Sequence, residues 1–250
     1  MSILKDSISL NLLRQLFCVG DLAIGGLTPF TTIDFPGRLA TVLYTQGCAW
    51  DCRYCHNSHL QKFDTDNKDG WEDAVKFLSR RASFLDGVVF CGGEPTAHES
   101  LKSAIRQVKG MGYLVALHTS GMYPERFRSV VSDCDWVGMD VKAPFDDYEK
   151  ITQRAGSGEA VRESVEILVQ SKVDYEVRTT VHPDLLSEND IMDMAHQLRG
   201  LGVENYTLQA FRESGCRDRR LEGTIIAEGI VSVYLRQALG LLFKNFRIRQ

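Results

Sequence analysis

Short apolar runs alternate with amphipathic segments from residue 39 onward, and this alternation predicts strands and helices in turn. β-Branched and apolar residues fill the short runs, which is typical of buried strands. Strands are expected over Leu39–Thr45, Gly87–Cys91, Tyr113–Leu117, Trp136–Val141, Tyr175–Val181 and Asn205–Phe211. Helical spacing is found over Trp71–Phe84, His98–Lys109, Pro124–Val131, Glu159–Gln170, Glu188–Leu198 and residues 225–243.

Six strands that alternate with helices predict an α/β fold with a parallel sheet. Six units fall short of the eight of a closed barrel, so a partial (βα)6 barrel is expected over residues 24–220. Residues 1–23 are interpreted as an N-terminal extension with a short packing helix. Residues 221–250 are interpreted as a last helix followed by a tail from Lys244 to Gln250.

Composition excludes several classes of protein. The 250 residues carry a net charge of −4, which argues against a nucleic-acid partner. No apolar run is long enough for a transmembrane helix, and the N-terminal apolar stretch is broken by Asn11, Arg14 and Gln15, so neither a membrane nor a secretory signal is expected. Seven cysteines is an odd number for a disulfide framework. We therefore expect a cytoplasmic protein with reduced thiols, some of them bound to metal.

Polar residues gather where the predicted strands end, which is where parallel α/β proteins bind ligands. The first strand is followed by a cysteine cluster and the second by Gly92-Gly93-Glu94-Pro95. The later strands carry His118, Thr119, Ser120, Asp140, Lys142, Arg178, Thr180, His182 and Gln209 at or near their ends. Polar groups at successive strand ends predict one shared site.

Three cysteines lie close together at Cys48, Cys52 and Cys55. A structural zinc site has four ligands, often in two separated pairs, and no second pair of cysteines follows. A zinc site that includes His56 or His59 stays open, as does a helical stripe of cysteines. Gly47, Asp51 and Asn57 favour a curled loop, which would bring three thiolates around one iron–sulfur cluster with one iron left open.

These segments carry a resemblance. Cys48-x3-Cys52-x2-Cys55 with Tyr54 before the last cysteine resembles the radical S-adenosylmethionine (SAM) superfamily, and the Gly92-Gly93-Glu94-Pro95 run resembles its glycine-rich motif. Three further stretches are similar to the activating proteins of anaerobic ribonucleoside-triphosphate reductases, a branch related to the pyruvate formate-lyase activating enzymes. They are residues 26–37, Met139–Pro144 and Arg178–His182. The resemblance covers about residues 24–212.

The resemblance implies a partial barrel of the radical SAM type that uses a 4Fe-4S cluster and SAM. Reductive cleavage of SAM would yield a 5′-deoxyadenosyl radical, which in activases removes hydrogen from a glycine of a partner glycyl radical enzyme. Cys48, Cys52 and Cys55 would bind iron and act through the cluster. The residues expected to contact SAM are Tyr54, Gly92, Gly93, Glu94, Thr119, Ser120, Asp140, Lys142, Arg178 and Thr180. Glu94 would accept a hydrogen bond from the SAM ammonium group. A flavodoxin or ferredoxin-type protein would supply the electron.

Some features limit or widen this interpretation. His118 stands where pyruvate formate-lyase activating enzymes have an acid that helps to build a monovalent cation site, so that site is in doubt. The stretch from Arg212 to Arg220 is interpreted as a solvated loop or a surface that steers an acidic partner. A radical SAM enzyme for a pterin-like or deazapurine-like small molecule is the alternative function. A non-enzymatic iron–sulfur carrier would leave the Gly-Gly-Glu and Asp-x-Lys segments unexplained.

Overall fold

The computed structural model describes residues 22–63, 70–221 and 231–249. They build one sheet whose eight strands follow one another in sequence order. The strands are β1 (Ile24–Thr31), β2 (Ala40–Thr45), β3 (Gly87–Gly92), β4 (Leu114–Thr119), β5 (Trp136–Asp140), β6 (Asp174–Val181), β7 (Asn205–Ala210) and β8 (Asn245–Arg249). Strand β1 is antiparallel to β2, whereas β2 to β8 are parallel. Strands β1 and β8 are the two edges, so the sheet is a partial barrel that does not close.

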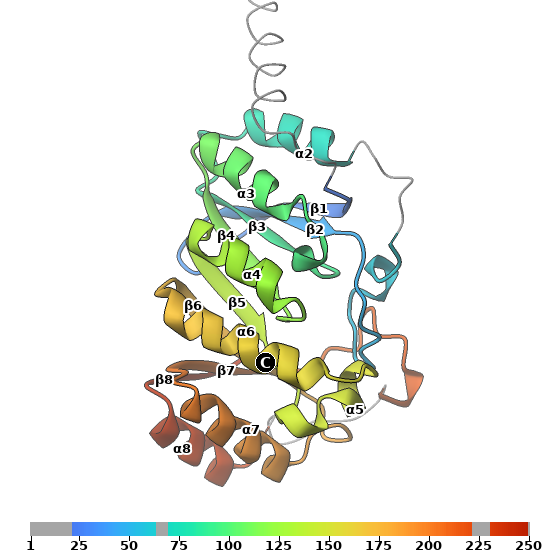
Figure 1. The fold of residues 1–250 in the computed structure, drawn as a ribbon, viewed down its shortest axis with the longest axis vertical. Coiled ribbons are helices and arrows are strands. Elements are labelled where there is room, and N and C mark those ends of the chain that lie inside the picture. Colours follow the sequence, from blue (N-terminus) through green and yellow to red (C-terminus); the bar gives the residue numbers. More distant parts are fainter. Residues whose placement is uncertain (1–21, 64–69, 222–230, 250) are drawn as a thin grey trace, which may run out of the picture.

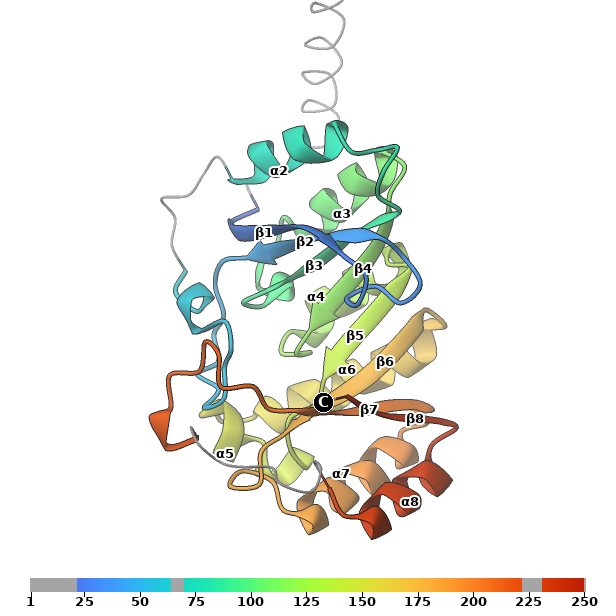
Figure 2. The ribbon, with the colours of Figure 1, turned by 180° about the vertical axis from the view of Figure 1, so that it is seen from behind.

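Helices cover the convex face of this sheet, and no helix of the described residues lies on the concave face (Figures 1 and 2). They are α2 (Gly70–Ser79), α3 (Leu101–Gly110), α4 (Pro124–Val130), α5 (Glu149–Thr152), α6 (Ser157–Ser171), α7 (Glu188–Gly200) and α8 (Val233–Leu242). The described residues also form five 3-10 turns, at Ser58–Leu60, Pro95–Ala97, Val131–Asp133, Phe145–Asp147 and Arg219–Leu221. In the described parts of the chain, no helix has the length and apolar character needed to cross a bilayer.

The six predicted strands and the helices between them are confirmed within a few residues, but both edges of the sheet were missed. Strand β1 contains a Gly-Gly pair and Pro29, and its pairing with β2 shifts register at two places, which only an edge strand tolerates. The predicted tail after Lys244 is wrong, because Asn245–Arg249 forms β8 beside β7. The predicted N-terminal helix and the start of the 225–243 helix lie outside the described residues.

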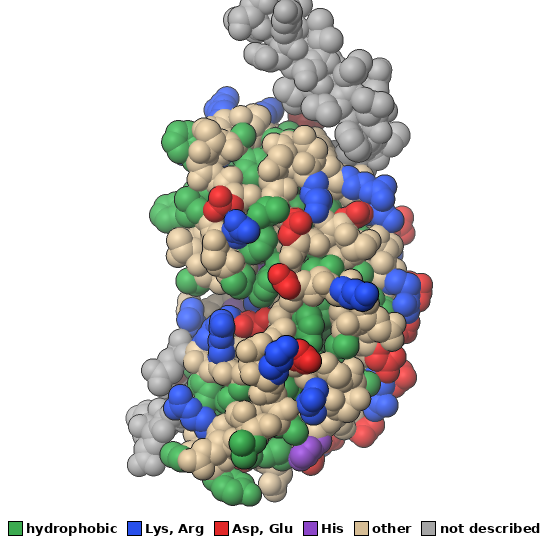
Figure 3. Space-filling view, turned by 90° about the vertical axis from the view of Figure 1, so that its left-hand side faces the viewer, with side chains coloured by type: hydrophobic (Ala, Val, Ile, Leu, Met, Phe, Trp, Pro, Cys, Tyr) green, Lys and Arg blue, Asp and Glu red, His purple; other side chains and the backbone are tan. Residues whose placement is uncertain are grey.

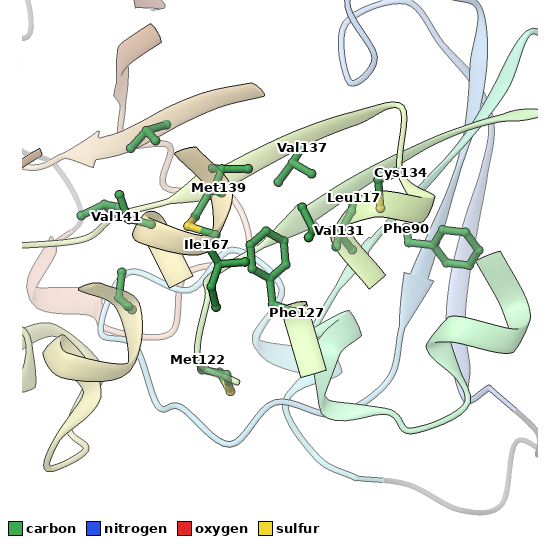
Figure 4. Close-up of a cluster of buried hydrophobic side chains, with 14 of the residues drawn as sticks. Phe90, Leu117, Met122, Phe127, Val131, Cys134, Val137, Met139, Val141 and Ile167 are labelled. Atoms are coloured by element: carbon green, nitrogen blue, oxygen red, sulfur yellow. The ribbon is translucent and has the colours of Figure 1, made fainter. Parts of the chain in front are cut away.

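The main core lies between the sheet and its helices. Phe127 of α4 is fully buried, and Figure 4 shows its ring close to Leu117, Val137 and Ile167, which come from β4, β5 and α6. Removing a buried aromatic side chain of this kind costs about 3–5 kcal/mol. This layer fixes the strands against the helices, so the strand ends that carry the polar residues are held in place.

A second, smaller core fills the amino end of the concave face. The loop between β1 and β2 turns inward and places Phe35, which is 5% exposed, 6.4 Å from the ring of Trp136. The same loop sends the carbonyl of Asp34 to His118, whose Nε2 donates to it over 2.8 Å. The loop therefore closes this end of the barrel and leaves polar side chains along the rest of the inner face.

Candidate functional site

The cysteine loop, residues 47–58, follows β2 and is held by backbone hydrogen bonds from several directions. The amide of Cys48 donates to the Gln61 carbonyl over 2.9 Å, and the amide of Cys55 donates to the Cys52 carbonyl over 3.1 Å. The amide of Asp51 donates to Thr152, at the end of α5. These bonds replace a helical ladder, so the loop interpretation of the three cysteines is confirmed and the helical stripe is excluded.

The three cysteines are free thiols, each half-buried. Burial raises the pKa of Cys48 to about 12 and that of Cys52 to about 11, so neither thiol ionises near neutral pH without a bound cation. Among the described residues, no three His, Cys, Asp or Glu side chains are placed to hold a single metal ion. Three thiols on one curled loop fit a 4Fe-4S cluster, in which each thiolate bonds a different iron and metal binding drives the ionisation.

The glycine-rich run after β3 packs directly against the start of the cysteine loop. The amide of Gly93 donates to Thr45, and the amide of Glu94 donates to the Gly47 carbonyl, each over 2.9 Å. A Cβ atom on Gly93 would lie 2.3 Å from that Gly47 carbonyl oxygen, so only glycine fits at this position. The two segments that the sequence identified separately are thus neighbours in the structure.

The Glu94 carboxylate is 1% exposed and is saturated by hydrogen bonds from the protein. Its Oε1 accepts from the amide and hydroxyl of Thr96, over 3.0 and 2.5 Å, and from the Thr119 hydroxyl over 2.6 Å. Its Oε2 accepts from the amide and hydroxyl of Ser120, over 2.8 and 2.6 Å. A carboxylate has about four lone-pair positions, and five donors occupy them. Sequence reasoning did not foresee that Glu94 joins the ends of β3 and β4 in this way.

A second group of polar residues crosses the inner face. The Nε of Arg178 donates to Oδ1 of Asp140 over 2.9 Å, and its Nη1 lies 3.5 Å from Nδ1 of His118. Because Nε2 of His118 donates to Asp34, Nδ1 must be the acceptor. Burial and the Arg178 cation lower the pKa of His118 to about 4, so the ring is neutral near pH 7. Burial alone would raise the pKa of Asp140, but Arg178 and Lys142 outweigh it, and the pKa is lowered.

We call the side chains of Glu94, Thr119, Ser120, His118, Asp140 and Arg178 the inner-face network. From the sequence, five of these residues were predicted to contact SAM, and His118 was used only as evidence against a cation site. The structure gives His118 a defined place as the acceptor beside Arg178. Asp140 faces the cations Arg178 and Lys142, which lower the pKa of its carboxyl group.

Lys142 links this network to the cysteine loop. Its ammonium group lies 5.5 Å from the centre of the Tyr54 ring, and Tyr54 is 5% exposed. Burial would lower the pKa of Lys142, but the surrounding groups Tyr54, Cys52 and Asp140 raise it well above its ordinary value. The lysine therefore stays charged between the cysteine loop and β5.

The remaining candidates are Thr180 and His182, at the end of β6. Thr180 lies on the inner face beside Arg178, where its hydroxyl accepts a hydrogen bond from Gln209 over 2.9 Å. His182 is 1% exposed; its Nε2 donates to the Leu221 carbonyl and its Nδ1 accepts from the Asp184 amide. Both ring nitrogens of His182 are used internally, so the structural interpretation of that histidine holds.

Comparison with known proteins agrees with these features. The sequence profile of the Radical SAM superfamily matches residues 42–198. A protein of Methanocaldococcus jannaschii named as a glycyl-radical enzyme activating enzyme is 29% identical over 206 residues, which are 80% of this chain and 84% of that protein. The pyruvate formate-lyase-activating enzyme of Clostridium pasteurianum is 27% identical over 191 residues, 73% of this chain and 79% of that protein. The structure of QueE from Escherichia coli has the same fold, with a TM-score of 0.57 at 17% identity, and the match covers 95% of this chain and 97% of that chain.

Proposed function

The chain belongs to the radical SAM superfamily, and from this premise we propose that it activates a glycyl radical enzyme by removing a hydrogen atom from a glycine of that partner. The observation that carries the proposal is the similarity to two activating enzymes over about four-fifths of their lengths, on a barrel that is open between β1 and β8. An unclosed barrel leaves its inner face accessible to a polypeptide segment.

The residues fit the two cofactors of the superfamily. Cys48, Cys52 and Cys55 would hold a 4Fe-4S cluster. The chemistry that the bound cluster and SAM supply is one-electron cleavage of the SAM carbon–sulfur bond, which yields methionine and a 5′-deoxyadenosyl radical. The protein contributes the positions of the reacting groups and the exclusion of water.

The inner face offers complementary groups for the charged ends of SAM. Lys142 and Arg178 are cations suited to its carboxylate. Within the described residues, Arg178 occupies only Oδ1 of Asp140, so Oδ2 is available to a ribose hydroxyl. Thr180 and the backbone around Gly92 and Gly93 would line the same ligand, with Tyr54 beside the adenine.

Glu94 needs a revised role within this proposal. Its five donors leave no free oxygen for the SAM ammonium group. It can serve SAM by fixing Thr119 and Ser120, or by exchanging one of their hydroxyl bonds for the ammonium. In both cases the carboxylate determines the shape of the amino-acid end of the site.

The partner that fits best is an anaerobic ribonucleoside-triphosphate reductase, because the segments at residues 26–37 and 139–144 are similar to its activating proteins. A flavodoxin or ferredoxin-type donor and a cytoplasmic location complete the proposal. No general base is required, since a hydrogen atom leaves the glycine and not a proton.

The test uses candidate reductases that carry α-deuterated glycine, incubated anaerobically with the iron-loaded protein, SAM and a reductant. Deuterium should enter 5′-deoxyadenosine, and electron paramagnetic resonance should detect a glycyl radical on the partner. Radical formation with unlabelled 5′-deoxyadenosine contradicts direct abstraction. Turnover that depends on a pterin-like or deazapurine-like molecule, and on no glycyl radical protein, supports the alternative small-molecule function.

A further inference from the structure

A segment after β7 lies on the cysteine loop, far from it in sequence. We call residues 211–221 the strap. The Ser58 hydroxyl donates to the Gly215 carbonyl over 3.0 Å, and Nδ1 of His56 donates to the Ser214 carbonyl over 3.2 Å. A Cβ atom on Gly215 would lie 2.0 Å from the His56 carbonyl oxygen, so the two backbones are in direct contact. The strap therefore packs against the cysteine loop and covers part of the side of the loop that faces away from the barrel.

Ion pairs fix the same contact. Asp218 of the strap lies 3.1 Å from Arg53 of the cysteine loop and 2.7 Å from Arg220. The Cys216 thiol lies 3.5 Å from the Arg53 carbonyl. One carboxylate thus holds two arginines in a defined arrangement, and both guanidinium groups stay at the surface.

A cavity of about 360 Å³ opens between the cysteine loop and the strap. Two of the three proposed iron ligands, Cys52 and Cys55, line it. The charged residues that line it with them are three arginines and two aspartates, Arg53, Arg217, Arg220, Asp51 and Asp218. None of the inner-face network lines this cavity. The iron ligands are therefore approachable from the outside of the loop, on a path separate from the SAM-binding groups.

The strap is basic in a chain that is acidic overall. Residues 212–220 contain four arginines, Arg212, Arg217, Arg219 and Arg220, against two acids, whereas the whole chain carries −4. All four arginines are exposed. On the face seen from the amino ends of the strands, by contrast, basic and acidic side chains are intermingled (Figure 3). The strap thus offers a local positive field next to the cysteines.

We propose that the strap and the outer side of the cysteine loop form the docking surface for an acidic one-electron donor protein. The inference rests on the proposed function, because only a cluster that must be reduced needs such a donor. One electron passes from the donor to the cluster by way of Cys52 or Cys55; the donor is oxidised by one electron, and no atom moves between the proteins. The glycine substrate must instead reach the inner face, where Asp140 and Arg178 lie.

The experiment measures reduction of the cluster by reduced flavodoxin, an acidic FMN protein, in the iron-loaded chain without SAM or partner. The double variant Arg217→Glu/Arg220→Glu should slow the reduction at least about 10-fold at low ionic strength, with a smaller difference at high salt. The matched control Arg80→Glu/Arg81→Glu makes the same charge change after α2 and should leave the rate near wild type. Photoreduced 5-deazariboflavin, which is uncharged, should reduce all three proteins equally.

Equal rates with flavodoxin in all three proteins overturn the proposal, as does equal slowing by the control pair. If Arg217→Glu/Arg220→Glu lowers the iron content, the milder variant Arg217→Gln is tested in its place. Its cluster should be reduced by flavodoxin about threefold more slowly than that of the wild type. Arg217→Glu/Arg220→Glu could instead be reduced by flavodoxin at the wild-type rate and yet form no glycyl radical on the partner when deazariboflavin supplies the electron. That result assigns the surface to the substrate protein and refutes the docking of the donor. Charge-dependent reduction of the cluster, together with no glycyl radical on any candidate partner in the deuterium experiment, keeps the docking surface and refutes the activase.

Discussion

The inner-face network and the cysteine loop differ in how far the protein alone satisfies their polar groups. Glu94 accepts five hydrogen bonds, and the Arg178 guanidinium is paired with Asp140. The thiols of Cys48 and Cys52, in contrast, are half-buried with their pKa values raised by that burial. The network is therefore organised by the protein itself, whereas in the proposed function the thiols of the cysteine loop ionise only when a metal cluster binds.

This difference explains where each region gets its rigidity. The inner face is fixed by bonds between strand ends, which rest on a packed core. The cysteine loop is fixed from outside by backbone bonds and by the strap. A ligand-binding surface that is already satisfied loses little freedom on binding, which favours affinity. A metal loop that is incomplete couples its folding to metal binding.

The largest effect is expected at the loop. Replacing Cys48, Cys52 or Cys55 by Ala removes one of the three thiolates and should abolish the cluster, so that bound iron falls from about four atoms per chain to nearly none. Cys216→Ala is the matched control, because that thiol is near the loop but outside the motif, and it should retain full iron content. Iron and sulfide analysis after anaerobic reconstitution checks both results. Iron loss in the control alone would reverse the assignment, and a zinc-only protein would end it. Cys18, which lies outside the described residues, should likewise be dispensable.

The next largest effect is expected in the inner-face network, at Glu94. Glu94→Ala leaves the donors of Thr119 and Ser120 without their acceptor, and affinity for SAM should fall about 10- to 150-fold, the equivalent of about 1.5–3 kcal/mol for a charge-assisted bond. Calorimetric titration of the iron-loaded protein measures this change.

Thr96→Val distinguishes the two roles of Glu94. It removes one hydroxyl donor to the carboxylate at a residue that is not a proposed SAM contact. If the network positions the site, SAM affinity falls severalfold. If Glu94 acts only by touching the ammonium group, Thr96→Val binds SAM like the wild type. Unchanged affinity in Glu94→Ala itself removes this residue from the site.

The last effect, on folding stability alone, concerns the neutral histidine of the network. Below pH 6.5 the unfolded chain takes up a proton on His118, which the folded protein does not accept until about pH 4. Folding stability therefore falls as the pH drops through this range, by about 2 kcal/mol between pH 7 and pH 5. His118→Asn lacks the titrating ring. Its free energy of unfolding, measured by urea titration, should therefore change about 2 kcal/mol less between pH 7 and pH 5 than that of the wild type. Identical pH profiles for both proteins would mean that His118 is protonated inside the barrel.

Sequence reasoning located the strands, the helices and the three cysteines, because each is a local pattern. Alternation of apolar runs and helical spacing depends on neighbouring residues only, and the same holds for the spacing from Cys48 to Cys55. Strand ends of a parallel sheet meet at one edge, so the polar residues after the strands could be assigned to one site from topology alone.

The edges of the sheet were harder to predict. The Gly-Gly pair and Pro29 in β1 disfavour a strand by propensity, and pairing with β2 overrides them. Strand β8 reads Asn-Phe-Arg-Ile-Arg, a period-two alternation that was available in the sequence. Five residues at the end of the chain were too short a pattern to distinguish a strand from a tail.

The sequence by itself determined which residues are chemically suited to the site, namely three thiols, a Gly-Gly-Glu turn, and charged residues at strand ends. Only the tertiary structure decided how they are used. The Glu94 carboxylate is saturated by Ser120, 26 residues away, and Arg53 meets Asp218 across 165 residues. Contacts of this kind arise when the barrel closes loops over long stretches of chain, and no local periodicity encodes which donor will reach which acceptor.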